Sequence, residues 1–90
     1  MDFDWDDANL THIAAHGVSR DDAEDVFYNG GVELSPRIEG DEDRRRVVGP
    51  TNSGWVLVVA FIMRGGLIRV VTAFPAGPAA LRIYNGGRSK

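Results

Sequence analysis

Apolar and polar positions divide the chain into a first part with helical periodicity and a longer part with strand periodicity. Residues 3–6 alternate apolar and acidic side chains, which predicts a short half-buried strand. Two short helices follow. The first begins at the acidic residues 6–7, because negative charge favours a helix N-terminus, and ends at Gly17. The second opens with the capping-box spacing of residues 19–22 and ends at residues 29–31.

Beyond residue 31 the pattern favours strands joined by tight connections. The predicted strands cover residues 32–38, 44–48, 55–63 and 67–74. Residues 39–43 read as a turn, residues 49–54 as a loop, and residues 64–66 as a hairpin turn. A last short helix is predicted over residues 79–84, after a Gly-Pro pair suited to a helix start.

This order of elements predicts one small α+β domain over residues 1–90, with the helices on one face of an antiparallel sheet of three to four strands. Ninety residues, 43% of them hydrophobic, suffice for one core. Trp5, Phe27 and Trp55 are candidates for that core rather than for base stacking.

The charges of the chain are divided between its two parts. All thirteen acidic residues lie in residues 1–43, whereas residues 44–90 hold eight Arg or Lys and no acid. Such asymmetry indicates a surface that meets an anion, nucleic acid above all, or an oppositely charged partner. The other interpretation is that the two parts pair with each other in the fold.

Several classes of site are excluded or disfavoured. The absence of cysteine excludes disulfides, thiolate metal sites and a cysteine nucleophile. His12 and His16 have metal-ligand spacing on one helix, but no third ligand pattern accompanies them, so no metal or cofactor is predicted. The N-terminus is acidic, unlike a secretory signal, and the longest apolar run, residues 55–63, is too short to span a bilayer. We therefore expect a cytoplasmic protein without a membrane segment.

Several short motifs occur together in a fixed order. Residues 3–6 (Phe-Asp-Trp-Asp) are followed by residues 16–19 (His-Gly-Val-Ser), then by Glu42-Asp43-Arg44 and a strand ending in glycine. Residues 69–73 read Arg-Val-Val-Thr-Ala, and Tyr84 lies near the end of the last helix. This set resembles the BrnT family over nearly the whole chain. BrnT proteins are toxins of type II toxin–antitoxin systems with a RelE-like ribonuclease fold.

The resemblance implies a RelE-like fold, metal-independent cleavage of RNA, and neutralisation by a cognate antitoxin protein. Such cleavage needs removal of the 2′-OH proton, stabilisation of charge on the phosphorane, and protonation of the leaving oxygen. The matching residues are Arg69 and Arg44 for the phosphate, with Glu42 or His16 for proton transfer. Each also has a structural interpretation: a salt bridge to an acid of residues 1–43 for Arg69, solvation for Arg44 and Glu42, and a helix end for His16.

The chain departs from the family pattern at its C-terminal part. Phe74 stands where the family has an arginine, residues 74–81 are nearly apolar where the family is basic, and Ala15 replaces a lysine. Strand alternation puts Arg44 and Arg46 on one face and Arg45 on the other; it puts Arg69 and Phe74 on opposite faces unless a bulge intervenes. The alternatives are a catalytically impaired relative that acts as a protein-binding module, and a regulatory DNA-binding protein.

Overall fold

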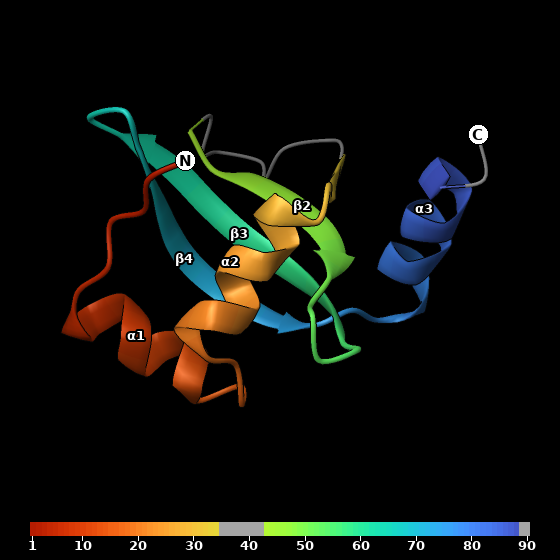
Figure 1. Cartoon of the computed structure of the whole chain (residues 1–90), viewed down its shortest axis with the longest axis horizontal. Helices are drawn as coiled ribbons and strands as arrows, with labels where there is room; N and C mark the ends of the chain where they lie inside the picture. Colours follow the sequence, from red (N-terminus) through yellow and green to blue (C-terminus); the bar gives the residue numbers. More distant parts are fainter. Residues whose placement is uncertain (35–42, 89–90) are drawn as a thin grey trace.

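The structure is a computed structural model that describes residues 1–34 and 43–88 of the chain. Four antiparallel strands form one sheet in the order β1-β2-β3-β4 (Figure 1). The elements are α1 (Asp7–Ala14), α2 (Arg20–Tyr28), β1 (Val32–Leu34), β2 (Arg45–Pro50), β3 (Val56–Arg64), β4 (Leu67–Pro75) and α3 (Pro78–Arg88). The α+β class expected from the sequence is therefore confirmed.

Both N-terminal helices begin with reciprocal side-chain caps. Asp6 accepts a hydrogen bond from the Asn9 backbone N–H, and the Asn9 side chain accepts one from the Asp6 N–H. Ser19 and Asp22 form the same arrangement at the start of α2, as their spacing predicts. These caps satisfy N–H groups that the first turn of a helix leaves without partners.

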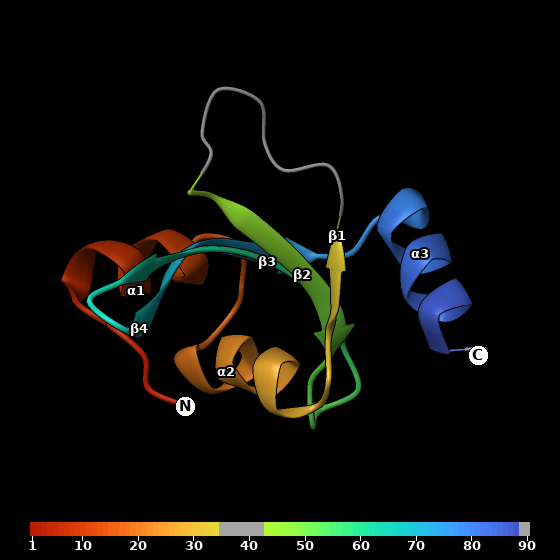
Figure 2. The same ribbon diagram turned by 90° about the horizontal axis from the view of Figure 1, so that it is seen from above.

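The sheet is apolar on both faces, and helices pack against each of them. The first face, against α1 and α2, includes Val47 and Val59, whereas their neighbours Val48 and Val58 lie on the second face, against α3. Figure 2 shows α2 inside the curve of the sheet and α3 outside it. The expectation that all helices share one face is wrong for α3, because buried valines on both sides of β2 and β3 require a second covering layer.

Several predicted bounds also differ from the structure. β2 continues through Gly49 and Pro50, whereas the sequence predicts a loop there. Proline has no N–H to donate, but β1 pairs with β2 only as far as Val48, so no hydrogen bond to β1 is required at Pro50. α3 runs to Arg88 rather than residue 84. The expected N-terminal strand is a single parallel bridge from Phe3 to Ile68.

Three further expectations concern individual segments. Trp55 is 42% exposed and is not a core residue, because it ends a turn before β3 begins. Trp5 and Phe27 do pack against the core, as expected. The predicted strand over residues 32–38 is seen as β1, and its remainder lies outside the described residues. In the described part of the chain, no helix has the length and apolar character needed to cross a membrane.

A β-bulge interrupts the pairing of β3 with β4. Ala60 lies opposite Thr72 and the next residue, Phe61, lies opposite Val70, so Val71 is an extra residue in β4. An extra residue reverses the alternation of the side chains that follow it. Ile68 and Val70 before the bulge and Ala73 after it therefore all lie on the first face. By the same count, Arg69 and Phe74 share the second face.

α2 lies very close to β2 where two glycines meet. A Cβ atom on Gly49 would lie 2.9 Å from Cα of Gly31 and 3.1 Å from Cγ1 of Val26. A Cβ on Gly31 would lie 2.6 Å from Cγ2 of Val47. Only glycine fits such an approach without movement of the helix.

Candidate functional site

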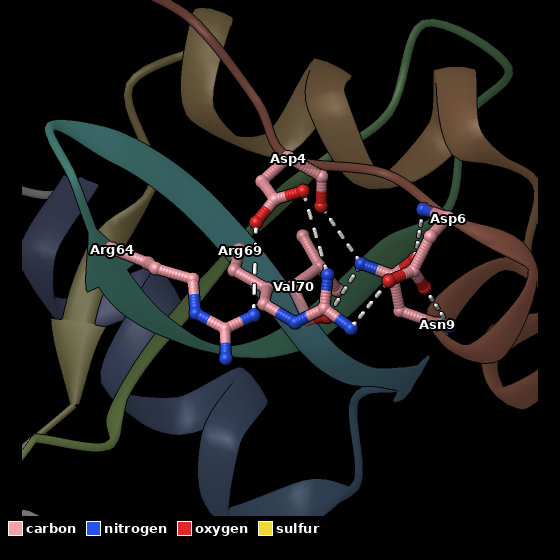
Figure 3. Close-up of polar contacts among 6 residues, drawn as sticks. All are labelled: Asp4, Asp6, Asn9, Arg64, Arg69 and Val70. Carbon is pink, nitrogen blue, oxygen red and sulfur yellow. Dashed lines mark hydrogen bonds and ion pairs between the residues drawn. The ribbon is translucent and has the colours of Figure 1, made fainter.

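Arg69 lies at the centre of an ion-pair cluster at the β4 edge of the sheet (Figure 3). Its Nη2 lies 3.0 Å from Oδ2 of Asp6, and its Nη1 lies 3.5 Å from Oδ1 of Asp4. Arg64 is more distant, with Nη1 3.9 Å from the other oxygen of Asp4. The Arg69 side chain is 17% exposed, so two carboxylates compensate its partly buried charge. The salt bridge to N-terminal acids is thus present.

The backbone places both acids beside β4. The Asp4 N–H donates to the carbonyl of Ile68, and the Ile68 N–H donates to the carbonyl of Asp2. The buried side chain of Asn9 donates to the carbonyls of Asp4 and Val70, at 2.9 and 3.1 Å. The N-terminal segment and α1 are thereby attached to the edge of the sheet, and Asp6 faces Arg69 from the cap of α1.

Asp6 is held in its charged form. The backbone N–H of Asn9, and then the hydrogen bond and charge of Arg69, lower the pKa of the Asp6 carboxyl below its ordinary value of 3.8, whereas desolvation acts in the opposite direction. The same carboxylate thus stabilises the start of α1 and its contact with β4.

Strand pairing places further arginine side chains on the second face. Arg46 lies opposite Ala60, whose partner on β4 is Thr72, and Arg69 lies opposite Ile62. Arg44 directly precedes β2, and continuation of the register sets it level with Ile62. Arg44, Arg46 and Arg69 therefore lie on one face of the sheet. Each belongs to a row of residues paired across β2, β3 and β4, and the backbones of β2 and β4 are about 10 Å apart along such a row.

Arg45 lies on the opposite face, as alternation predicts. Its guanidinium makes two hydrogen bonds to the Glu33 carboxylate and lies 5.2 Å from the centre of the Phe61 ring. The hydrogen bond to Glu33 raises the pKa of Arg45 above its ordinary value. Arg45 thus interacts with Glu33 and Phe61 on the first face and is not part of the group of arginines on the second face.

A groove of about 430 Å³ lies between α3 and the second face. Its walls are apolar apart from Arg46, and Phe74 contributes an aromatic ring. The other lining residues are Leu34, Val58, Gly77, Pro78, Ala79, Ala80 and Ile83. This mixture of apolar walls and one cationic group is typical of ligand-binding hollows.

The two histidines lie at the β4 side of the molecule. The His16 ring is 6.2 Å from the Phe74 ring and 6.1 Å from the His12 ring, measured between centroids. His12 lines a smaller pocket of about 170 Å³ together with Arg69 and Asn9. Among the described residues, no group of three or more His, Asp or Glu side chains could hold a metal ion.

The predicted site residues are thus only partly assembled. Arg44 and Arg69 share a face, His16 lies against Phe74, and Glu42 lies outside the described residues. Sequence reasoning allowed a salt bridge from Arg69 to an acid of the first part but did not identify Asp4 and Asp6 as its partners. The alternation of residues 3–6 could have indicated these partners. It predicts a strand with Asp4 and Asp6 on the same face, and a neighbouring strand could place Arg69 beside both.

The structure also accounts for part of the charge asymmetry. Asp4 and Asp6 pair with Arg69, and Glu33 pairs with Arg45, so some acids of the first part do meet the basic part. Acids of α2 instead accept hydrogen bonds from uncharged groups: Glu24 from Trp5, Asp22 from Ser53 and Asp25 from Asn52. Acidic groups on α2 and arginines on the second face thus lie on opposite sides of the sheet.

Comparison with known families identifies the chain. The family model described as the ribonuclease toxin, BrnT, of type II toxin–antitoxin systems matches residues 5–78, which is most of the sequence. A comparison with curated proteins finds no match. The matched segment runs from Trp5, through all four strands, to the first residue of α3. The chain belongs to the BrnT family, the ribonuclease toxins of type II toxin–antitoxin systems.

Proposed function

We propose that this chain is an active toxin that cleaves RNA without a metal ion, in the cytoplasm, until a cognate antitoxin binds it. Family membership supports the ribonuclease class. The observation that carries the proposal is the placement of Arg44, Arg46 and Arg69 on one face of the sheet. Arginines gathered on one surface favour binding of a phosphate backbone.

The proposed chemistry assigns two roles. Arg44 and Arg69 bind the scissile phosphate and stabilise the charge that develops as the 2′-oxygen attacks phosphorus. His16 or Glu42 takes the proton from the 2′-OH and returns one to the leaving 5′-oxygen, since an imidazole or a carboxylate can serve both transfers. The products are a cyclic phosphate and a free 5′-hydroxyl.

Arg69 must change partners to act in this way. Its Nη1 is buried beside Asp4 and makes no hydrogen bond, whereas Nη2 is held by Asp6 at 3.0 Å. In our proposal an RNA phosphate replaces Asp4 at Nη1, while Asp6 keeps the side chain in position. The longer of the two ion pairs is the one exchanged.

Expression of the protein in cells without an antitoxin tests the proposal. We expect growth arrest with loss of RNA, relief by Arg44→Ala and Arg69→Ala, and no relief by the control Arg45→Ala, whose side chain lies on the first face. Purified protein should cleave single-stranded RNA in the presence of EDTA. Normal growth and intact RNA at matched protein levels would overturn the proposed activity.

The second candidate function is that of a protein-binding module without catalysis. One observation and one implication of the family resemblance favour it: Arg69 is already paired with two carboxylates, and Phe74 stands where the resemblance implies an arginine. In that case the protein binds a partner with high affinity, the purified chain leaves RNA intact, and Arg69→Ala changes stability alone. Measuring RNA cleavage and partner binding on the same preparation separates the two functions.

A further inference from the structure

The groove beside α3 combines three features that suit one nucleotide of a single-stranded RNA. Apolar residues of the sheet and of α3, among them Val58 and Ile83, form its walls, Phe74 provides an aromatic ring, and Arg46 provides a positive charge. Proteins that bind single-stranded nucleic acid combine aromatic side chains, on which bases stack, with cationic groups that follow the backbone. The groove brings both within one volume of about 430 Å³.

The bulge at Val71 determines that Phe74 takes part. Without the extra residue, Phe74 would lie on the first face, within the core that α1 and α2 cover. In the structure Phe74 is half-buried, opposite Val58, and the His16 ring packs edge-on against it. Phe74 thus contacts His16 on the α1 side and lines the groove on the α3 side.

The polar surroundings of the groove favour an anion. Arg46 lies on the row between Leu34 and Ala60, so its guanidinium is the charged group within the lining. Ala79 and Ala80 come from the first turn of α3, which holds no acidic residue. The positive end of that helix adds to the charge of Arg46.

We propose that this groove is a nucleotide subsite in which one unpaired RNA base stacks on Phe74 while the adjoining phosphate pairs with Arg46. The inference rests on the proposed function, because it takes RNA as the ligand. Arg46 lies on the second-face row next to that of Arg44 and Arg69, and Phe74 lies one row further along, so the phosphate bound by Arg46 neighbours the scissile phosphate. The subsite selects single-stranded RNA, since a paired base cannot enter.

Binding can be measured apart from cleavage with a short single-stranded RNA that carries 2′-O-methyl groups and therefore lacks the attacking hydroxyl. Phe74→Leu, which keeps an apolar side chain but removes the ring, should weaken binding about tenfold. Phe74→Tyr should restore binding to within about twofold of the parent. Thermal unfolding of each variant separates lost stacking from lost folding. Equal affinity of the folded Leu variant and the parent would overturn the stacking assignment.

Filling the groove provides a second test with a matched control. Gly77 lines the groove, and a Cβ there meets no atom within 4 Å, so Gly77→Leu adds an apolar side chain without a backbone clash. Gly86 on α3 also has open space but does not line the groove. We expect Gly77→Leu to reduce affinity for the 2′-O-methyl RNA at least tenfold and Gly86→Leu to leave it unchanged. Equal affinities would contradict the subsite.

The outcomes distinguish this inference from the proposed function. If the parent binds the modified RNA, Phe74→Leu and Gly77→Leu weaken that binding, and natural RNA stays intact, the catalytic proposal fails and the subsite stands. If the parent cleaves RNA and the Phe74 and Gly77 variants cleave it with the same KM, the subsite fails alone. A groove that serves the antitoxin would show loss of antitoxin binding in Gly77→Leu with RNA affinity intact, which also overturns the subsite.

Discussion

The guanidinium of Arg69 on β4 lies 3.0 Å from the carboxylate of Asp6, which also caps α1. One side chain thus connects the sheet to the start of a helix far away in sequence. Removal of Arg69 leaves Asp6 without its cation and Asp4 with only the more distant Arg64, so the repulsion between the two carboxylates is less well compensated.

We therefore predict that Arg69→Met lowers the free energy of unfolding by about 1–2 kcal/mol, a value below that of a fully buried pair because Asp6 is half exposed. Arg64→Met is the control: Arg64 is 62% exposed and 3.9 Å from Asp4, so its loss should cost about 0.5 kcal/mol or less. Urea unfolding of the two variants measures the difference. Equal effects would show that the Arg69 pairs contribute nothing specific.

The lowered pKa of Asp6 predicts a dependence of stability on pH. A carboxyl whose pKa falls on folding stabilises the native state above its unfolded pKa, and the contribution disappears as the pH falls through the folded pKa. Asp6→Asn keeps a capping side chain but cannot ionise. The parent should be more stable than Asp6→Asn near neutral pH, and the difference should shrink below about pH 4. Denaturant unfolding across that range provides the measurement; a constant difference would contradict the assignment.

The contact between Gly31 and Gly49 predicts strong sensitivity to an added methyl group. Gly49→Ala would place Cβ 2.9 Å from Cα of Gly31, so α2 must move away from β2, and we expect a loss of about 2–3 kcal/mol. Gly86→Ala is the control, since its site on α3 is open and alanine favours a helix by up to about 1 kcal/mol. Opposite shifts in the urea midpoint would confirm the close approach of α2 to β2. A midpoint for Gly49→Ala equal to that of the parent would disprove it.

Salt dependence of RNA binding can distinguish the two faces of β2. Each arginine that contacts a phosphate of single-stranded RNA contributes about 0.7 to the slope of log affinity against log salt concentration. Arg46→Ala should therefore reduce the slope by about 0.7, whereas Arg45→Ala, on the first face beside Glu33, should leave it unchanged. Affinities for the 2′-O-methyl RNA at several salt concentrations provide the slopes. Equal reductions for both variants would exclude a face-specific contact.

The sequence predicted the elements that depend on local chemistry. The Ser19 and Asp22 cap, the Gly65-Gly66 hairpin and the alternation of Arg45 and Arg46 all follow from spacing within a few residues. It did not predict the partners of Arg69, because Asp4 and Asp6 are more than sixty residues away in the chain and their meeting depends on the N-terminal segment reaching β4.

The position of α3 and the face of Phe74 required the structure for another reason. Apolar residues on both sides of β2 and β3 indicate burial but do not reveal which helix covers which side. Simple alternation predicts Phe74 and Arg69 on opposite faces of β4. The bulge places them on the same face, and no residue type in β4 indicates a bulge. The candidate site was therefore predictable as a set of arginines, but not as an arrangement.

Because Val71 is an extra residue, the face of the sheet on which each later side chain of β4 lies depends on the number of residues before it and not on its type. Deletion of one codon there would transfer the side chains of residues 72–75 to the opposite side of the sheet while changing none of them. The same rule governs comparison between relatives. If a relative lacks the extra residue, its alignment with this chain has a one-residue gap within β4. Aligned residues beyond that gap then lie on opposite faces of the sheet in the two proteins. The residue that corresponds to Phe74 in space is therefore one position away from the residue aligned with it.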